Sequence, residues 1–136
     1  MPVDGEDAIR EILELERIAV VGASTDYDKA AHIVPAFLQR KGYHLVPVNP
    51  NAEAVFGRLA SNSLAEVDEE IEIVQVFRPS DEVERIVDQA IARDDVRVIW
   101  TQPGIRDDRA ARRAERAGLD VVQDRCMKAE YGMVMR

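Results

Sequence analysis

The stretch RIAVVGAS, residues 17–24, decides the fold. Its apolar run from Ile18 to Val21 is continuous and mostly β-branched, which is typical of a strand buried on both faces. Parallel sheets bury their strands in this way because helices cover both sides. Gly22 follows where the chain must turn tightly. The stretch therefore predicts the first strand of a parallel sheet.

Helical and strand patterns alternate after this stretch. Apolar residues from Ile33 to Leu38 recur at helical spacing and stop at Lys41-Gly42, so Pro35 is expected in the first turn of that helix or at a kink. Further β-branched runs predict strands over 43–48, 71–77, 96–100 and 119–122. Residues 57–64 are ambiguous, and one interpretation is a short edge strand before a helical turn.

Two further helices are expected between these strands. Ser80 is expected to cap the first, and an alanine face is expected to let the second approach the sheet closely: Ala110, Ala111, Ala114 and Ala117. Strands that alternate with helices predict a Rossmann-like, doubly wound parallel sheet in a three-layer α/β/α arrangement.

The 136 residues fit a single α/β domain. We expect a core over 17–125 and a C-terminal tail over 126–136. Residues 1–16 are expected to form an accessory N-terminal helix, with Ile9, Ile12 and Leu13 as its apolar stripe.

Composition narrows the compartment and the partners. No apolar run approaches the ~20 residues that span a bilayer, and the N-terminus is acidic where a secretory signal is basic. A net charge of −8 with dispersed arginines argues against nucleic acid. The lone Cys126 can form no internal disulfide. We expect a cytoplasmic protein without membrane or nucleic-acid partners.

The acidic composition also raises a hypothesis about the source. Lysine occurs only at positions 29, 41 and 128, against 26 Asp and Glu residues. A solvated acidic surface of this kind suits a high-salt organism, in which stability would rise with molar KCl.

Polar turns follow each long strand of the predicted sheet. They are Gly22 to Thr25, Asn49 to Asn51, Arg78 to Ser80, Gln102 to Gly104, and Gln123 to Arg125. Parallel strands bring their carboxyl ends to one edge, where such folds bind ligands. The five turns are therefore expected to converge on one face.

The first turn is a candidate phosphate site, since backbone N–H groups and the next helix N-terminus favour anions. The alternative is that Gly22 only permits the turn and Ser24 caps a loop. The dinucleotide fingerprint is missing, because Ser24, Tyr27 and Asn49 replace two glycines and the ribose-binding acid. NAD is therefore improbable.

Five strings in order carry a family resemblance: VVGAS, KAAHIVPAFLQRKGYHLVPVNPN, VFRPSDEV, WTQPGI and QDRCMK. Together they resemble the stand-alone CoA-binding domain proteins, small relatives of the amino-terminal domain of the succinyl-CoA synthetase α-subunit. The resemblance spans Ile18 to about Lys128.

The resemblance implies a ligand and its contacts. Gly22, Ala23 and Ser24 would lie against the CoA phosphates, with Lys29 as a nearby cation and His32 within reach of a phosphate. Val48, Asn49 and Pro50 would border the adenosine. Phe77, Arg78 and Pro79 would cover the nucleotide and upper pantetheine arm, and Gln102 and Gly104 would form the wall farther along the cleft.

No catalytic constellation or metal site is found in the sequence. His32 and His44 fit surface or capping roles. Cys126 is either a small buried residue or a partner for a mixed disulfide with the CoA thiol, and Trp100 is either core or a base-stacking platform.

We therefore expect a domain that binds CoA or an acyl-CoA without chemistry of its own. The alternatives are an NAD(P)-dependent oxidoreductase domain and a detached acyl-CoA ligase subunit that acts with a catalytic partner chain. A homodimer scaffold is a third.

Overall fold

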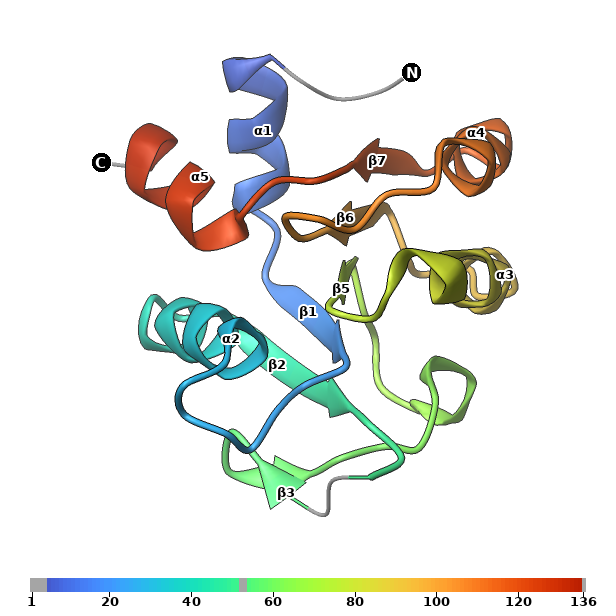
Figure 1. Ribbon diagram of the computed structural model, residues 1–136. Helices are drawn as coiled ribbons and strands as arrows, with labels where there is room; N and C mark the ends of the chain where they lie inside the picture. The colour runs from blue at the N-terminus through green and yellow to red at the C-terminus, as the bar shows by residue number, and fades with distance from the viewer. Residues whose placement is uncertain (1–4, 52–53, 136) are drawn as a thin grey trace.

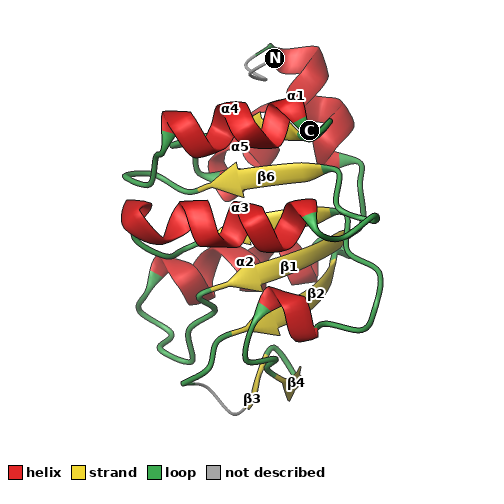
Figure 2. Cartoon of the chain, turned by 90° about the vertical axis from the view of Figure 1, so that its right-hand side faces the viewer, coloured by secondary structure: helices red, strands yellow, loops and turns green. Residues whose placement is uncertain are grey.

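A five-stranded parallel sheet forms the centre of the computed structural model, which describes residues 5–51 and 54–135. Its strands are β1 (Arg17–Val21), β2 (His44–Val48), β5 (Ile73–Val76), β6 (Val98–Thr101) and β7 (Asp120–Val122). Neighbouring strands pair in parallel, and the arrows of Figure 2 point to one side. The predicted Rossmann-like fold is confirmed.

The strand order decides where a ligand crevice opens. The order is β2-β1-β5-β6-β7, so the chain leaves β1 toward one edge of the sheet and later returns to its other side. Helix α2 (Ala30–Arg40) joins β1 to β2, and α3 (Val83–Ile91) joins β5 to β6 on the opposite face. The carboxyl ends of β1 and β5 therefore form the switch point at which such sheets hold ligands.

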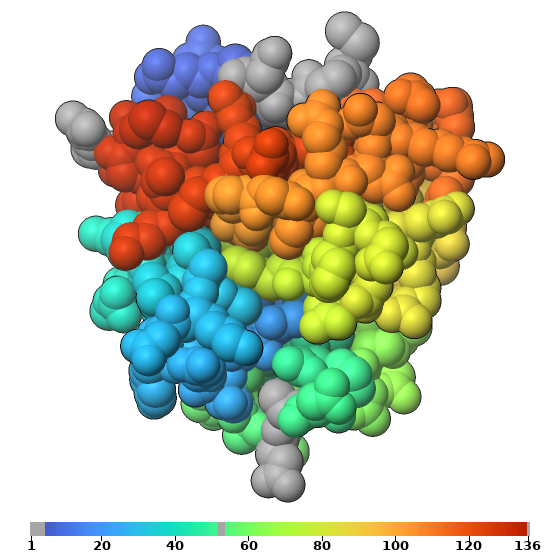
Figure 3. Space-filling model, viewed as in Figure 1, coloured from blue at the N-terminus to red at the C-terminus, as the bar shows by residue number. Residues whose placement is uncertain are grey.

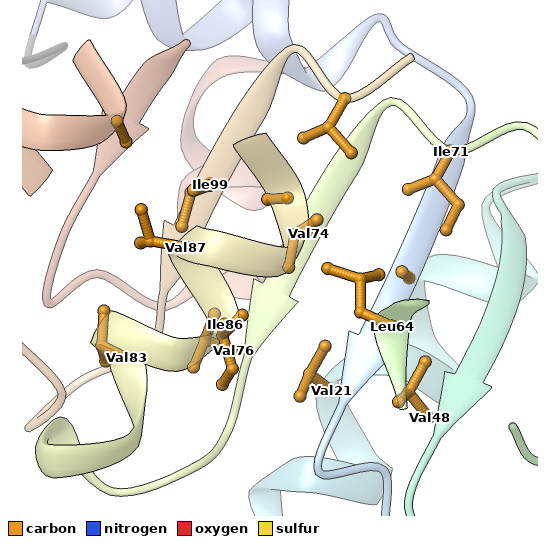
Figure 4. Packing of buried hydrophobic residues seen from close by; sticks show 14 of the residues in the cluster. Val21, Val48, Leu64, Ile71, Val74, Val76, Val83, Ile86, Val87 and Ile99 are labelled. Carbon is orange, nitrogen blue, oxygen red and sulfur yellow. The ribbon is translucent and has the colours of Figure 1, made fainter. Parts of the chain in front are cut away.

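Helices cover both faces of the sheet, as Figure 1 shows. One face carries α1 (Glu6–Leu13), α2 and α5 (Met127–Val134), which pack around the fully buried Trp100. The other carries α3 and α4 (Asp108–Arg116), whose side chains meet Val74 and Ile99 in the cluster of Figure 4. Each layer buries one apolar stripe, which is how amphipathic helices stabilise a sheet.

The segment after β2 forms a small two-stranded sheet, called the arm below. Strands β3 (Ala54–Val55) and β4 (Arg58–Leu59) pair antiparallel beside β2. Ser61 then bridges back: its N–H donates to Pro47 O (3.0 Å), and its carbonyl accepts from Asn49 N–H (2.9 Å). The short 3₁₀ helix η1 (Leu64–Glu66) follows and places Leu64 beside Val21 and Val48 (Figure 4).

The expected C-terminal tail is in fact helix α5. Met127 at its start is fully buried, and the Arg10 guanidinium donates to Val134 O through Nε (3.2 Å) and Nη2 (3.1 Å). Met127, Tyr131 and Val134 recur at helical spacing, so a signal was present in the sequence. It was weak because the run is short. The helix expected within residues 1–16 is α1, over Glu6–Leu13, and positions 1–4 of that range lie outside the described residues.

Two smaller expectations were wrong, and a third was excluded in part. Pro35 lies in the second turn of α2, which rules out the first turn and leaves the expected kink as the other alternative. Ser80 begins the 3₁₀ helix η2 (Ser80–Glu82), and its Oγ accepts Arg106 N–H (2.9 Å) instead of capping α3. Ala117 lies beyond α4 and is exposed. In the described ranges, no helix combines the length and apolar character that a bilayer crossing requires.

Candidate functional site

Hydrogen bonds tie the polar turns together along one edge of the sheet. The Asn49 amide Nδ2 donates to Ala23 O (2.7 Å), which joins the first turn to the second. Ser80 Oγ, in the third turn, accepts Arg106 N–H from the segment that directly follows the fourth turn. The fourth meets the fifth through Gly104 N–H and Asp124 Oδ1 (2.7 Å). The predicted convergence of the five turns is confirmed.

A crevice of about 280 Å³ opens at the switch point. Figure 3 shows a hollow where the blue, teal and yellow-green parts of the chain meet. The lining comes from the ends of β1, β2 and β5, from the loop before η1, and from the first turns after β5. Five of the predicted site residues contribute to it: Gly22, Val48, Asn49, Pro50 and Arg78.

Gly22 lets the floor of this crevice form. Its φ of +90° is one that side-chain-bearing residues rarely adopt, and its N–H donates to Val48 O (2.8 Å). A Cβ at this position would lie 2.9 Å from Arg78 Cδ and 3.3 Å from Arg78 Cγ. The missing side chain therefore makes room for the stem of Arg78, which crosses the end of β1.

Three charged side chains, Arg78, Glu82 and Arg85, lie together in the crevice lining. Arg78 Nη2 and Nε donate to the Glu82 carboxylate (2.7 and 3.2 Å), and Arg85 Nη2 donates to the same carboxylate (3.2 Å). The Arg78 hydrogen bond is the largest influence on Glu82 and lowers the pKa of that carboxyl. Two cations and one anion leave a net charge of +1 in a chain whose net charge is −8.

Both polar atoms of the Asn49 side chain make hydrogen bonds within the protein, and these hold the second turn in place. Besides the Asn49 Nδ2 bond to Ala23 O, Asn49 Oδ1 accepts Asn51 N–H (2.8 Å). Val48 is buried and lines the crevice, whereas Ala23 is buried and lies outside its lining. These residues shape the site, and the exposed Pro50 presents its ring at the rim.

Ser24, Lys29 and His32 lie in the loop and first turn on the α2 side, outside the crevice lining. Ser24 N–H donates to Ala31 O (3.2 Å), and Ser24 O meets His32 Nδ1 (2.7 Å). The N–H groups of Gly22 and Ser24 both donate hydrogen bonds within the protein. The groups on this side that would attract an anion are therefore the N-terminal end of α2 and the exposed Lys29.

The remaining predicted residues lie farther along the same edge and do not line the crevice. Phe77 is half-buried against the α2 and α5 layer, and Pro79 is exposed. Gln102 is buried, and its Oε1 accepts Met127 N–H (3.4 Å). Gly104 has φ +83°. Phe77 N–H donates to Val21 O (2.9 Å) and Pro79 O accepts Glu82 N–H (2.9 Å), so these two residues adjoin the crevice lining without being part of it.

Three residues considered for chemistry have clear surroundings. Trp100 is fully buried, with Nε1 donating to Arg125 O (2.8 Å), so the base-stacking hypothesis was wrong and the core interpretation is confirmed. His44 opens β2 at the far edge and meets Glu69 Oε1 (2.6 Å), which confirms a surface role. Cys126 is half-buried immediately before α5.

Sequence reasoning missed several lining residues: Asn62, Ser63, Glu82, Arg85 and Gln89. The last three recur at helical spacing after β5, so they share one polar face at the carboxyl end of a strand. That signal was available in the sequence. Asn62 and Ser63 reach the crevice through the path of the arm after β2, which no local pattern specifies.

Comparison with known proteins gives three findings. A family model described as a CoA binding domain matches residues 16–132. The uncharacterized protein YneT of Bacillus subtilis (strain 168) is 36% identical over 126 residues, which are 92% of this chain and 93% of YneT. A hypothetical protein from Pyrococcus horikoshii OT3 is 36% identical, with a TM-score of 0.93 over 100% of this chain and 97% of that one.

A larger protein shares the fold alone. An acetyl-coenzyme A synthetase 1 from Ca. Korarchaeum cryptofilum, described as dinucleotide forming, is 22% identical with a TM-score of 0.71. The similarity covers 83% of this chain but 26% of the synthetase. This domain architecture thus also occurs as one part of a larger chain.

Proposed function

Because this chain belongs to the family of CoA-binding domains, we propose that it binds coenzyme A or an acyl-CoA at the crevice between β1 and β5, and that it performs no chemistry of its own. The observation that carries the proposal is the position of Arg78 and Arg85 in that crevice. Guanidinium groups pair with phosphate oxygens through parallel hydrogen bonds, and CoA is a polyanion.

The size of the crevice decides how much of the ligand it encloses. Its volume of about 280 Å³ is just below the ~300–1,000 Å³ of typical ligand pockets, so one end of CoA fills it. We assign the adenosine end to it, beside Asn49 and Pro50. The phosphates then lie near Gly22 and Arg78, with Lys29 as a cation at the α2 side.

The rest of the ligand would follow the edge of the sheet. From Phe77 the edge continues past Gln102 and Gly104, whose turns are tied to their neighbours by the hydrogen bonds described above. An extended pantetheine arm needs such a surface, and not a second cavity.

The surroundings of the two histidines support a binding role without catalysis. The His32 ring is fixed by Ser24 O and lies 4.4 Å from the Tyr27 ring and 5.2 Å from the Phe56 ring. His44 contacts Glu69 at the opposite end of the strands. Among residues 5–51 and 54–135, neither histidine has a hydrogen bond to a Ser, Thr or Cys side chain that it would activate as a base.

A second candidate is a detached ligase subunit that acts with a catalytic partner chain. The fold likeness to one quarter of an acetyl-coenzyme A synthetase favours this alternative. A homodimer and an NAD(P)-dependent domain are weaker alternatives, and we place the protein in the cytoplasm, where CoA is available. Co-purification with a larger ATP-dependent chain would support the ligase alternative.

The deciding experiment is isothermal titration of the purified chain with CoA, acetyl-CoA and NADH, in low salt and in molar KCl. We expect saturable binding of CoA and acetyl-CoA, but not of NADH. A higher free energy of unfolding in molar KCl, together with retained CoA binding, would support the high-salt hypothesis. Absence of CoA binding at both salt levels would overturn the proposal.

Two variants locate the site. Arg78→Gln and Lys29→Ala are expected to weaken CoA binding, whereas Arg109→Gln, an exposed change on α4 with the same loss of charge, is expected to leave it unchanged. Equal losses in all three variants would indicate general attraction between charges, not a site at the switch point.

A further inference from the structure

The Glu82 carboxylate occupies one edge of the Arg78 guanidinium. The Nε and Nη2 atoms of Arg78 lie 3.2 and 2.7 Å from the two carboxylate oxygens. A guanidinium has five N–H donors, of which this pairing uses two. Three N–H donors therefore remain on a side chain that lines the crevice.

Glu82 is itself confined. Its side chain is 26% exposed, whereas Glu84 and Asp88 on the next turns are 64% and 63% exposed. Arg85 Nη2 donates to the same carboxylate from the other side (3.2 Å). The carboxylate thus bridges two arginines and has little freedom to rotate away from Arg78.

The stem of Arg78 lies close to the crevice floor. Its Cγ and Cδ pass over Gly22, close enough that an added Cβ would meet them at 3.3 and 2.9 Å. Although the Arg78 side chain is 46% exposed, its pairing with Glu82 restricts its rotamers before a ligand arrives. Such pre-ordering lowers the entropic cost of binding.

We propose that Glu82 is a positioning residue for ligand binding: it orients the Arg78 guanidinium over Gly22, so that the three unused N–H groups face the anionic part of the ligand. The inference rests on the proposed function, and it adds the residue that prepares the anion contact. A negative charge in a site for a polyanion is otherwise unfavourable, and its effect through Arg78 accounts for its position.

The test compares two variants that remove the same charge. Glu82→Gln removes the partner of Arg78. Glu84→Gln lies two residues on, pairs with Arg113 and does not line the crevice. Titration with CoA is expected to give roughly two- to twelvefold weaker binding for Glu82→Gln, the range for ordering one long side chain, and wild-type affinity for Glu84→Gln.

Two further measurements separate positioning from general effects. In the Arg78→Gln background, Glu82→Gln is expected to cause no further loss of CoA binding, since no Arg78 guanidinium remains to be oriented. In the ligand-free protein, the Arg78 Nε–H resonance in ¹⁵N spectra is expected to be sharp in wild type and in Glu84→Gln, and broadened in Glu82→Gln.

The outcomes distinguish the two proposals. Tighter CoA binding by Glu82→Gln would show that Glu82 competes with the ligand, and an unchanged Arg78 resonance would show that it orients nothing; either result overturns the inference. A wild-type chain that binds no CoA overturns the proposed function instead, and with it the ligand-binding role of Glu82, even where the resonance confirms that Glu82 orients Arg78.

Discussion

The backbone N–H of Ser24 donates a 3.2 Å hydrogen bond to the carbonyl oxygen of Ala31 in the first turn of α2. In a regular helix that carbonyl accepts an N–H from four residues on, but here that residue is Pro35, which has none. The proline thus frees an acceptor that the loop after β1 uses. A residue that weakens a helix therefore helps to fix a loop at the candidate site.

Pro35→Ala is expected to loosen this loop. The new N–H competes for Ala31 O, so exchange of the Ser24 amide hydrogen should speed up roughly fivefold, the effect of losing one ordinary hydrogen bond. Hydrogen exchange followed by NMR measures it. The Phe77 amide, bonded to Val21 O (2.9 Å), is the internal control. Faster exchange at both amides would indicate global destabilisation instead.

Gly22→Ala is expected to destabilise the fold more than Gly118→Ala. Both glycines have positive φ, +90° and +96°, so each substitution should cost about 1–2 kcal/mol of backbone strain. Only at Gly22 does the added Cβ meet Arg78, whereas nothing lies within 4 Å at Gly118. Urea denaturation measures the difference.

The contact explanation has its own check. Adding Arg78→Ala to Gly22→Ala should recover the part of the excess loss that Arg78 causes, while the 3.3 Å approach of the added Cβ to the Phe77 carbonyl carbon remains. If the two single glycine variants lose equal stability, the close approach of Arg78 has no energetic weight.

Arg93→Gln is expected to lower the free energy of unfolding by about 2–4 kcal/mol, since it removes several charge-assisted bonds from a mostly buried group. Arg93 donates to the carbonyls of Leu64, Val67 and Glu69 (2.8–3.1 Å) and pairs through two bonds with Asp95. Its side chain is 15% exposed.

This loss should also reach the crevice, because Arg93 fixes the segment that carries Ser63 and Leu64 into its wall. Urea denaturation and CoA titration measure the two effects. Arg85→Gln, which removes an exposed arginine, is the stability control and should change the unfolding free energy by less than about 1 kcal/mol.

Glu69→Gln tests how the stability of the contacts at the start of β2 depends on pH. The Arg58 hydrogen bond, followed by that of His44, lowers the pKa of Glu69 from 4.5 to about 2. A lowered folded-state pKa means that the stabilisation is present above pH 4.5 and is lost as the pH falls toward 2. The Tm of wild type should therefore exceed that of Glu69→Gln at pH 6, and the gap should close in this window.

The gap itself should be modest, at most about 1 kcal/mol, since the side chains involved are partly exposed to solvent. A gap that stays constant down to pH 2 would show that the contribution of Glu69 does not depend on its charge.

The sequence was sufficient for much of this fold. The β-branched runs starting at Ile18 and Ile71 are strands, and the helical spacing from Ile33 to Leu38 is a helix, because both patterns are dictated by which side chains must be buried. The sequence did not predict the contacts of every residue at the ends of helices. Ser80 was expected to cap a helix, but Arg106 approaches it from a turn 26 residues away, and no local pattern encodes that approach.

The sequence by itself determined the succession of strands and helices along the chain, the polar turns at the strand ends and the family resemblance. Each of these depends on residues that are close together in the chain. Only the tertiary structure decided which turns share a crevice. Gly22, Asn49 and Arg78 line it, whereas Lys29 and His32 lie on the α2 side. The physical reason is the reversal of strand order at β1, which places β5 beside β1, brings Arg78 over Gly22 and puts Glu82 in the same crevice lining.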